Sequence, residues 1–365
     1  MNNPPCVNQI HHGGKVYEAA KKLKCLPSEI LDFSANLNHY TPEIKENDWL
    51  KFKDSIFQYP PEENELKELL AHLYQTDPNC IIPTVGAIQA LHLACSFFKG
   101  KRMLWLEPGF SEYSRIANIE GLEPVPISVE LSLSAEEKFQ KLVKHSKEGD
   151  VILLCIPQNP SGEQLQWSAL IPVVEEFSDR NISWILDESF IEMTQSNYQG
   201  SLEFLDQFPN LFSCRSLTKN WKIPGLRFGF LSTSNAKMLE RSEKNRKQWS
   251  ISGVTNSWAQ TFLNKNLLQK NQTAIARLLL ETQSLIKTLE QNFYWKIYPT
   301  DTSFFLCELP NPLDALDLSQ QLLQKKILLR TYPGDPSLKD RSHLRIGSRT
   351  KEQNLLLIEA LRETI

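Results

Sequence analysis

The sequence lacks the features that mark membrane proteins, secreted proteins and nucleic-acid-binding proteins. None of its apolar runs approaches the roughly 20 residues that span a bilayer. Its 40 Lys and Arg nearly balance its 43 Asp and Glu, so no overall field favours nucleic acid or an anionic membrane. The opening MNNPPCVNQIHHGGK has no basic segment followed by an apolar one, as a secretory signal would. We therefore expect a cytoplasmic protein with no nucleic-acid or membrane partner.

Cysteines are few and scattered. The chain has seven, an odd number, and none stand at CxxC spacing. This pattern does not favour a disulfide framework or a zinc site. Cys95 and Cys155 stand in apolar runs and are expected in the core. We expect reduced thiols and no bound metal.

Short apolar runs dominate the middle of the chain, and each ends in polar or turn residues. They read RMLWLEP, DVILLCIPQNP, ISWILDESF, LFSCRSLTK and LRFGFLSTS. Helical spacing lies between several of them, as in the segment that starts at Ser168. Strands that alternate with helices predict an α/β fold with a mostly parallel sheet covered on both faces. Ligands bind at the carboxyl ends of such strands, so the polar residues there are the first candidates for chemistry.

The ends of the chain have a different character. Helical spacing predicts a short helix over residues 16–23, further helices over 62–74 and from Gly86, and a long one over 273–292. Strand patterns at 303–309 and 344–348 alternate with helical ones and predict a smaller α+β domain. We expect three parts: an N-terminal arm at 1–40 that packs with the small domain, a large domain at 41–240, and a small C-terminal domain at 241–365.

The strongest chemical signal is Lys219. It ends the strand pattern LFSCRSLTK and is followed by PGLRFG. A lysine nucleophile needs such a strand-end position and a lowered pKa. Hydroxyls at Ser216 and Thr218 and the cation of Arg227 could hold a phosphate. Alone, a lysine after a strand is most often solvated, and the flanking motif is what favours a cofactor site.

The motif SLTK-x4-PGLRFG resembles the Schiff-base motif of the class I/II aminotransferase family, the fold type I pyridoxal 5′-phosphate (PLP) enzymes. The resemblance extends, in order, over almost the whole chain. It implies a large domain with a mostly parallel seven-stranded sheet between helices, plus a smaller α+β domain. It also implies that Lys219 holds PLP as a Schiff base, and that the protein is a homodimer with shared active sites.

The resemblance assigns cofactor contacts to three further residues. Asp187 in ISWILDESF would pair with the protonated pyridine nitrogen, which makes the cofactor a better electron sink. Asn159 in PQNPSG would hydrogen-bond its phenolic oxygen, and Phe110 in EPGFSEY would stack on its ring. Without the family, Asp187 could be a cap or turn residue, Asn-Pro a simple turn signal, and Phe110 a core aromatic.

Two more positions concern the cofactor phosphate. Gly86-Ala87 resembles the helix start whose backbone N–H groups bind it, although a glycine helix cap is the simpler explanation. Tyr59 in QYPPEEN resembles a tyrosine that reaches the phosphate in the neighbouring subunit.

One departure from the family pattern concerns Phe190, where many histidinol-phosphate aminotransferases have a tyrosine. Asn159 would then carry more of the hydrogen bonding to the cofactor.

The N-terminal residues carry the signal for a subfamily. HGGK at 12–15 and LDFSANLN at 31–38 are similar to the opening of threonine-phosphate decarboxylases. The chain has His39 where that pattern usually has proline, so no ring locks this turn. By itself, HGG could belong to a flexible arm.

A phosphorylated amino acid carries a carboxylate, an amine and a phosphate, and this second phosphate needs its own cations and donors. By resemblance, Arg345 in HLRIGSRT would grip the α-carboxylate with its bidentate fork. Arg330 in ILLRTYPG would add a second cation, and His12, Ser34 and Asn36 would add donors from the arm. Either arginine could instead be a surface cation.

Three functions stay open, because decarboxylation and transamination use the same catalytic residues and differ in substrate orientation. HGG and LDFSAN favour decarboxylation of L-threonine O-3-phosphate to (R)-1-aminopropan-2-yl phosphate for cobalamin biosynthesis. The second is an aminotransferase, such as one for histidinol phosphate. The third is a non-catalytic protein on this fold, which the joint presence of the cofactor residues disfavours: Lys219, Asp187, Asn159 and Arg227.

Overall fold

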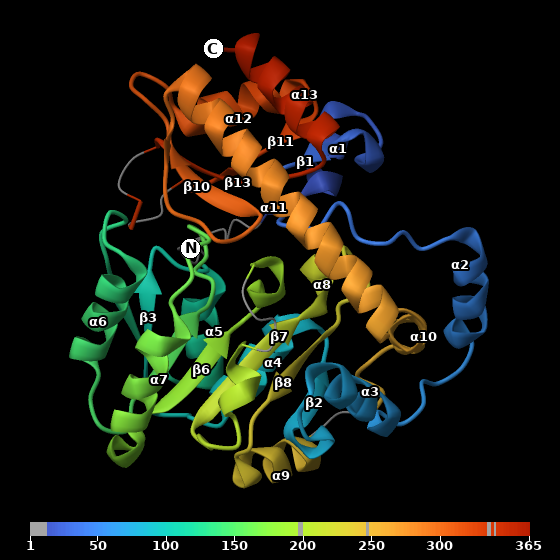
Figure 1. The fold of residues 1–365 in the computed structure, drawn as a ribbon, viewed down its shortest axis with the longest axis vertical. Helices are drawn as coiled ribbons and strands as arrows, with labels where there is room; N and C mark the ends of the chain where they lie inside the picture. The colour runs from blue at the N-terminus through green and yellow to red at the C-terminus, as the bar shows by residue number, and fades with distance from the viewer. Residues whose placement is uncertain (1–12, 196–199, 246–247, 334–336, 339–340) are drawn as a thin grey trace, which may run out of the picture.

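A seven-stranded sheet forms the larger part of the molecule (Figure 1). The computed structural model describes residues 13–195, 200–245, 248–333, 337–338 and 341–365. Only β8 runs antiparallel to its neighbours, so the sheet is mostly parallel, as predicted. The strands, in spatial order, are β2 (Ile81–Thr84), β8 (Gly229–Ser232), β7 (Leu211–Ser216), β6 (Ser183–Asp187), β5 (Val151–Cys155), β3 (Arg102–Glu107) and β4 (Glu123–Ser128).

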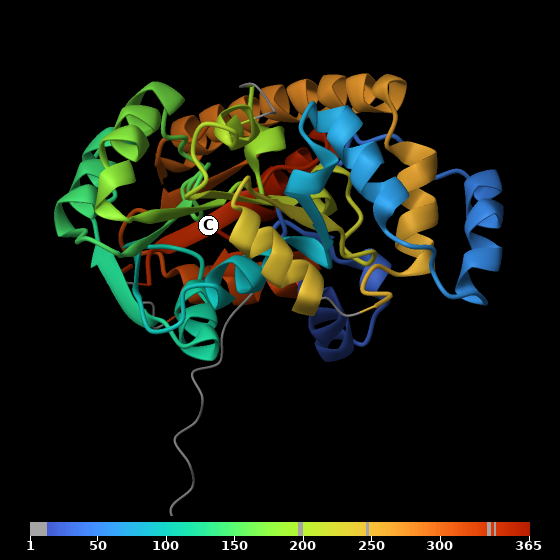
Figure 2. The ribbon, with the colours of Figure 1, turned by 90° about the horizontal axis from the view of Figure 1, so that it is seen from below.

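Helices cover both faces of this sheet, as the view from below shows (Figure 2). Successive side chains of a strand point to opposite faces, so Ile152 packs in one apolar core and Leu153 in the other. The first core includes α3 (Asn64–Tyr74), α6 (Ala135–His145), α7 (Trp167–Glu176) and α10 (Gly253–Phe262), and the second includes α4 (Gly86–Ser96), α5 (Glu112–Glu120) and α9 (Ala236–Asn245). The continuous apolar runs of the sequence are therefore strands buried on both sides.

A smaller antiparallel sheet lies above the first in Figure 1. Its strands, in order, are β12 (Arg330–Thr331), β13 (His343–Gly347), β10 (Phe304–Glu308) and β9 (Lys296–Ile297). It packs with the helices α11 (Lys265–Phe293), α12 (Ala315–Gln324) and α13 (Lys351–Arg362). This is the predicted α+β part.

The N-terminal segment joins the smaller sheet region. After α1 (Val16–Leu23), the short strand β1 (Leu31–Asp32) pairs in parallel with β11 (Ile327–Leu328). Phe33 is buried in the core of the smaller sheet. The chain then passes to α2 (Glu46–Lys53), which projects at the right of Figure 1.

The long helix α11 begins at Lys265, ahead of the predicted start at residue 273. The side chain of Asn264 accepts a hydrogen bond from the Leu267 amide (3.0 Å), which caps the helix there. The predicted division of the chain at residues 40 and 240 stays a prediction. Beyond the second position, Trp258 and Phe262 of α10 still pack in the core of the larger sheet.

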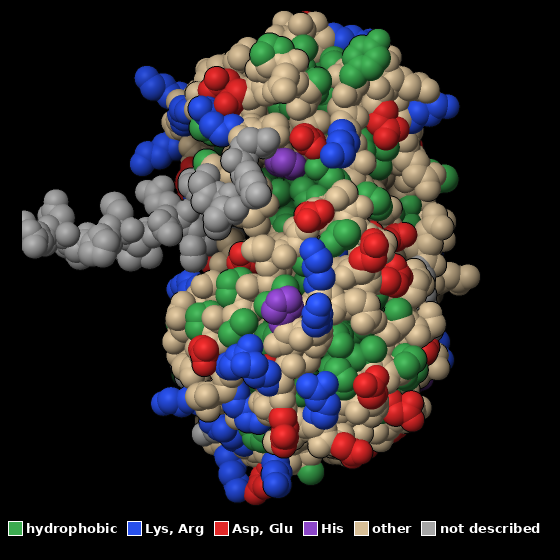
Figure 3. All heavy atoms as spheres, turned by 90° about the vertical axis from the view of Figure 1, so that its left-hand side faces the viewer, with side chains coloured by type: hydrophobic (Ala, Val, Ile, Leu, Met, Phe, Trp, Pro, Cys, Tyr) green, Lys and Arg blue, Asp and Glu red, His purple; other side chains and the backbone are tan. Residues whose placement is uncertain are grey.

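The surface bears out the balanced composition on the face shown in Figure 3, where acidic and basic side chains are interspersed with small apolar areas. Among the described residues, no helix is both long and apolar enough to cross a membrane.

Candidate active site

A cavity of about 540 Å³ lies between the carboxyl ends of the larger sheet's strands and the smaller sheet. Most of the residues predicted from sequence come together in its wall. They are Ser34, Asn36, Phe110, Asn159, Asp187, Thr218, Lys219, Arg227, Arg330 and Arg345. Tyr59 is an exposed residue that stacks on Trp249 at 4.4 Å, and His12 lies outside the described residues.

Lys219 lies on the single-turn helix α8 (Leu217–Asn220), directly after β7. Its Nζ is 3.4 Å from Ser216 Oγ and 4.8 Å from the centroid of the Phe190 ring. Burial lowers the pKa of the amine from 10.5 to about 8, against the opposing effect of the Asp187 carboxylate. About a tenth of the amine is therefore uncharged at pH 7, far more than for a lysine of ordinary pKa, and the uncharged form is the nucleophile.

Gly86, at the start of α4, lies beside Thr218 and Arg227. A Cβ built on Gly86 would come within 3.1 Å of Arg227 Nη2 and 3.9 Å of Thr218 Oγ1. A Cβ on Gly229 would come within 3.0 Å of the Ala87 nitrogen, so both glycines allow a close approach of backbone. A helix N-terminus, a hydroxyl and a guanidinium in this arrangement suit a phosphate.

Asp187 is the last residue of β6 and is buried. Its carboxylate accepts two hydrogen bonds. Tyr113 Oη donates to its Oδ2 (2.7 Å), and the Ser189 amide donates to its Oδ1 (3.1 Å). Burial raises the pKa of the Tyr113 phenol well above 10, so that group remains a donor. A carboxylate has about four acceptor sites, which leaves room for a cationic N–H. Sequence reasoning missed Tyr113, although it stands one helical turn beyond Phe110.

Asn159 is linked to the smaller sheet through Arg345. Its Oδ1 accepts from Arg345 Nη1 (2.8 Å), and Arg345 Nη2 donates to the Ser34 carbonyl (2.8 Å). The Asn159 amide nitrogen is then the group left to donate. Arg345 Nε is buried without a hydrogen-bond partner among the described residues, as are both amide atoms of Asn36. Because Arg345 and Asn36 both line the cavity, these groups are available to hydrogen-bond a polar ligand there.

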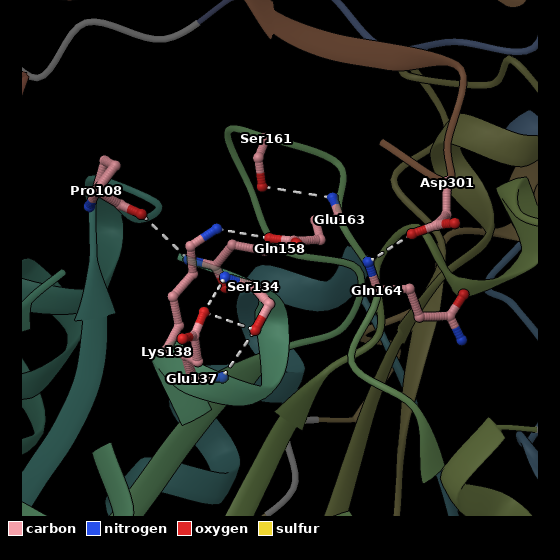
Figure 4. A network of polar contacts seen from close by, with 9 residues as sticks. All are labelled: Pro108, Ser134, Glu137, Lys138, Gln158, Ser161, Glu163, Gln164 and Asp301. Atoms are coloured by element: carbon pink, nitrogen blue, oxygen red, sulfur yellow. Dashed lines mark hydrogen bonds and ion pairs between the residues drawn. The ribbon is translucent and has the colours of Figure 1, made fainter. Parts of the chain in front are cut away.

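The loop that carries Asn159 is held from two sides (Figure 4). Lys138 of α6 forms an ion pair with Glu163 (2.6 Å), and Gln158 Nε2 donates to the Pro108 carbonyl (3.1 Å). From the smaller sheet region, Asp301 Oδ2 accepts from the Gln164 amide (2.8 Å). These contacts carried no periodic signal in the sequence, because they join distant segments.

The residues present fit PLP. The cofactor offers an aldehyde, an aromatic ring with a basic nitrogen, and a phosphate. The cavity offers an amine of lowered pKa, the ring of Phe110, the Asp187 carboxylate and the cradle beside Gly86. Within the described part of the chain, no group of three or more His, Cys, Asp or Glu could hold a metal ion.

The chain is similar to proteins of known family and activity. The family described as "Aminotransferase class I and II" matches residues 28–361. Threonine-phosphate decarboxylase of Salmonella typhimurium is 29% identical, over 97% of this chain and 96% of that protein. Histidinol-phosphate aminotransferase of Flavobacterium johnsoniae is 26% identical, over 85% and 86%. The solved histidinol-phosphate aminotransferase of Sinorhizobium meliloti, in complex with PLP, has a TM-score of 0.77 at 16% identity, and the match covers 100% of this chain and 99% of that one.

Replacing Lys219 tests the covalent attachment. The Lys219→Ala chain, loaded with PLP, reduced with borohydride and dialysed, should retain no cofactor by intact mass, because no other lysine among the described residues lines the cavity. Lys222→Ala, a change of an exposed lysine one turn away, should retain it as the unchanged chain does. Retention by the Lys219 variant would rule out the assignment.

The lowered pKa of Lys219 predicts a pH dependence for cofactor capture. Only the uncharged amine is nucleophilic, so the rate of capture by cofactor-free protein should rise about tenfold per pH unit up to a midpoint near 8, then level off. Stopped-flow absorbance measures it. A rate that still climbs at pH 10 would indicate an ordinary solvated lysine.

Proposed function

Since this chain belongs to the class I and II aminotransferases, a PLP-dependent enzyme family, we propose that it removes the α-carboxylate of L-threonine O-3-phosphate. The product would be (R)-1-aminopropan-2-yl phosphate, for cobalamin biosynthesis. The similarity to threonine-phosphate decarboxylase along nearly the whole chain supports this choice. A cytoplasmic location is part of the same proposal.

The main structural support for a doubly anionic substrate is a pair of arginines. Arg330 on β12 lies directly opposite Arg345 on β13 in antiparallel register, and both line the cavity. Residues in such a pair project from the same face of a sheet, and like charges there are destabilising. An anionic ligand between the two guanidinium groups would be attracted by both charges. A phosphorylated amino acid brings two anionic groups, its carboxylate and its phosphate, in addition to the phosphate of the cofactor.

Gly13, Gly14 and residues 34–37 of the segments that resemble the decarboxylase opening line the cavity. Ser34 Oγ accepts from the Gly14 amide (2.8 Å) and donates to Asp32 Oδ1 (2.5 Å). Gly13 lies so close to Ser34 that a Cβ there would come within 2.1 Å of its carbonyl oxygen. Asn36 adds a donor and an acceptor that have no partner in the described chain. These contacts support a role for the HGG and LDFSAN segments in binding the substrate.

PLP supplies, when bound, an electron sink for the bond that breaks at Cα. The chain's own groups do the rest. Asp187, held by Tyr113 and Ser189, offers a negative charge for a protonated ring nitrogen. Lys219, with its lowered pKa, can give or take a proton at Cα. Arg330 and Arg345 would hold two substituents of the substrate and so decide which bond at Cα breaks.

The reaction is tested with the PLP-loaded enzyme and L-threonine phosphate, without an oxo-acid acceptor. Decarboxylation predicts CO2 over many turnovers, with the yellow colour of the cofactor retained. One equivalent of oxo product with bleaching, and no CO2, would indicate an aminotransferase instead, the activity named for the Flavobacterium johnsoniae relative. A chain that neither releases CO2 nor bleaches would contradict both.

Arg330→Ala tests the second anion. It should raise KM for L-threonine phosphate about 10- to 100-fold, since hydrogen bonds to charged groups contribute about 1.5–3 kcal/mol. Any turnover of L-threonine, which has no phosphate, should change little. Arg341→Ala removes an exposed arginine that pairs with Asp314 and Asp317, and serves as the control. An equal loss on both substrates would contradict a phosphate contact.

We also propose a homodimer in which Tyr59 reaches the cofactor phosphate of the neighbouring subunit. Residues 49–59, which run through α2 and beyond it, expose Trp49, Leu50, Ile56, Phe57 and Tyr59, with Phe57 and Tyr59 78–79% accessible. Large apolar side chains gathered in this way are typical of an interface. A second copy of the chain would cover them.

Tyr59→Phe should shorten the retention of PLP about tenfold, because one hydrogen bond to a charged phosphate is lost, while the dimer persists in sedimentation. Tyr294→Phe, at an equally exposed tyrosine (81%) beyond the end of α11, is the control. A monomer that keeps its cofactor and full activity would contradict the proposed role of Tyr59 in a dimer.

A further inference from the structure

A buried line of side-chain amides from two other segments reaches Asn220, the residue after Lys219. Beside it, the backbone N–H of Asn38 donates to the backbone carbonyl of Lys219 (3.0 Å). Asn38 Nδ2 donates to Asn271 Oδ1 (3.0 Å), and Asn271 Nδ2 donates to Asn220 Oδ1 (2.5 Å). The three asparagines are at most 1% exposed. They come from the segment after Asn36, from α11 and from α8, so three parts of the chain meet at the short helix that carries the lysine.

The line continues beneath the cavity. Asn220 Nδ2 donates to Glu192 Oε2, and Tyr74 Oη donates to Glu192 Oε1 (2.6 Å). Glu192 lies in the 3-10 helix η5 (Ile191–Met193), directly after Phe190, whose ring faces the Lys219 amine. Burial raises the pKa of the Glu192 carboxyl. The helix that carries Lys219 is therefore tied to the loop that follows Asp187.

Asn271 occupies the central place. It accepts from Asn38 and donates to Asn220, so neighbours on both sides fix the orientation of its amide. An apolar side chain there would leave the Asn38 donor and one Asn220 acceptor buried without partners, at about 1–3 kcal/mol each. The helix that carries Asn271 runs from the larger sheet region to the smaller one (Figure 1).

We propose that Asn271 is a positioning residue for Lys219. Through Asn220 it sets the placement of α8, and through Asn38 it joins α8 to the segment that carries Ser34 and Asn36. The position of the Lys219 side chain in the cavity then depends on an amide that does not line the cavity. This role requires Lys219 to hold the cofactor, and it is the same for decarboxylation and transamination.

Three variants of the PLP-loaded enzyme test the proposal: Asn271→Leu, Asn271→Ser and, as control, Thr273→Val at an exposed position on α11. The first readout is the pH midpoint of the cofactor's visible absorbance, measured without substrate. The second is kcat and KM for L-threonine phosphate. The Leu variant should move the midpoint and lower kcat about 10- to 100-fold, with KM little changed, because small misplacements cost that much. Serine, which can still donate and accept, should restore most of both. The control should match the unchanged chain.

A Leu variant that melts at a lower temperature but keeps the midpoint and kcat would overturn the proposal, since Asn271 would then be merely structural. If that variant does not fold, Asn38→Ala breaks the same link from the other side and should give the same two changes. The midpoint needs no substrate, so a failure of the proposed decarboxylation leaves this test intact.

Discussion

A partly buried amine in the same cavity as a buried carboxylate is the constraint on which the rest of this structure depends. Burial lowers the pKa of Lys219 to about 8, which favours the uncharged, nucleophilic form of the amine. Asp187 opposes that effect, and it keeps its own place through Tyr113 and Ser189. Both residues stand where parallel strands end, at the edge of the sheet where α/β folds bind ligands. The sheet thus supplies rigid positions that a loop would not.

The upper half of the site comes from elsewhere in the chain. Arg345 reaches down from β13 to Asn159 and to the Ser34 carbonyl, so one guanidinium joins three segments. The loop around Asn159 is in turn tied to Asp301. The cavity is therefore lined by residues of both sheet regions, and the orientation of the proposed substrate would depend on how these regions meet. That dependence is the physical reason why one cofactor site can serve either decarboxylation or transamination.

The sequence predicted the parallel sheet and most of the residues that line the cavity. The other features could not be predicted, for physical reasons that differ from one to the next. Continuous apolar runs predicted the parallel strands, and SLTK with PGLRFG placed Lys219, Thr218 and Arg227 in one cavity. Tyr113, Asp301 and Asn271 were missed, because each acts through a partner far away in the chain. The pairing of Arg330 with Arg345 rests on β12, a two-residue strand that has no periodicity to detect. The early start of α11 depends on the cap at Asn264.

The central claim is that the cavity holds a substrate with two anionic groups between Lys219 and the arginine pair. The most direct measurement is a crystal structure of the PLP-loaded enzyme with an unreactive phosphonate analogue of threonine phosphate. We expect the phosphonate beside Arg330 and the carboxylate at Arg345, with Asn36 hydrogen-bonded to the ligand. A phosphonate that points to solvent, with Arg330 turned away from it, would contradict binding by the arginine pair.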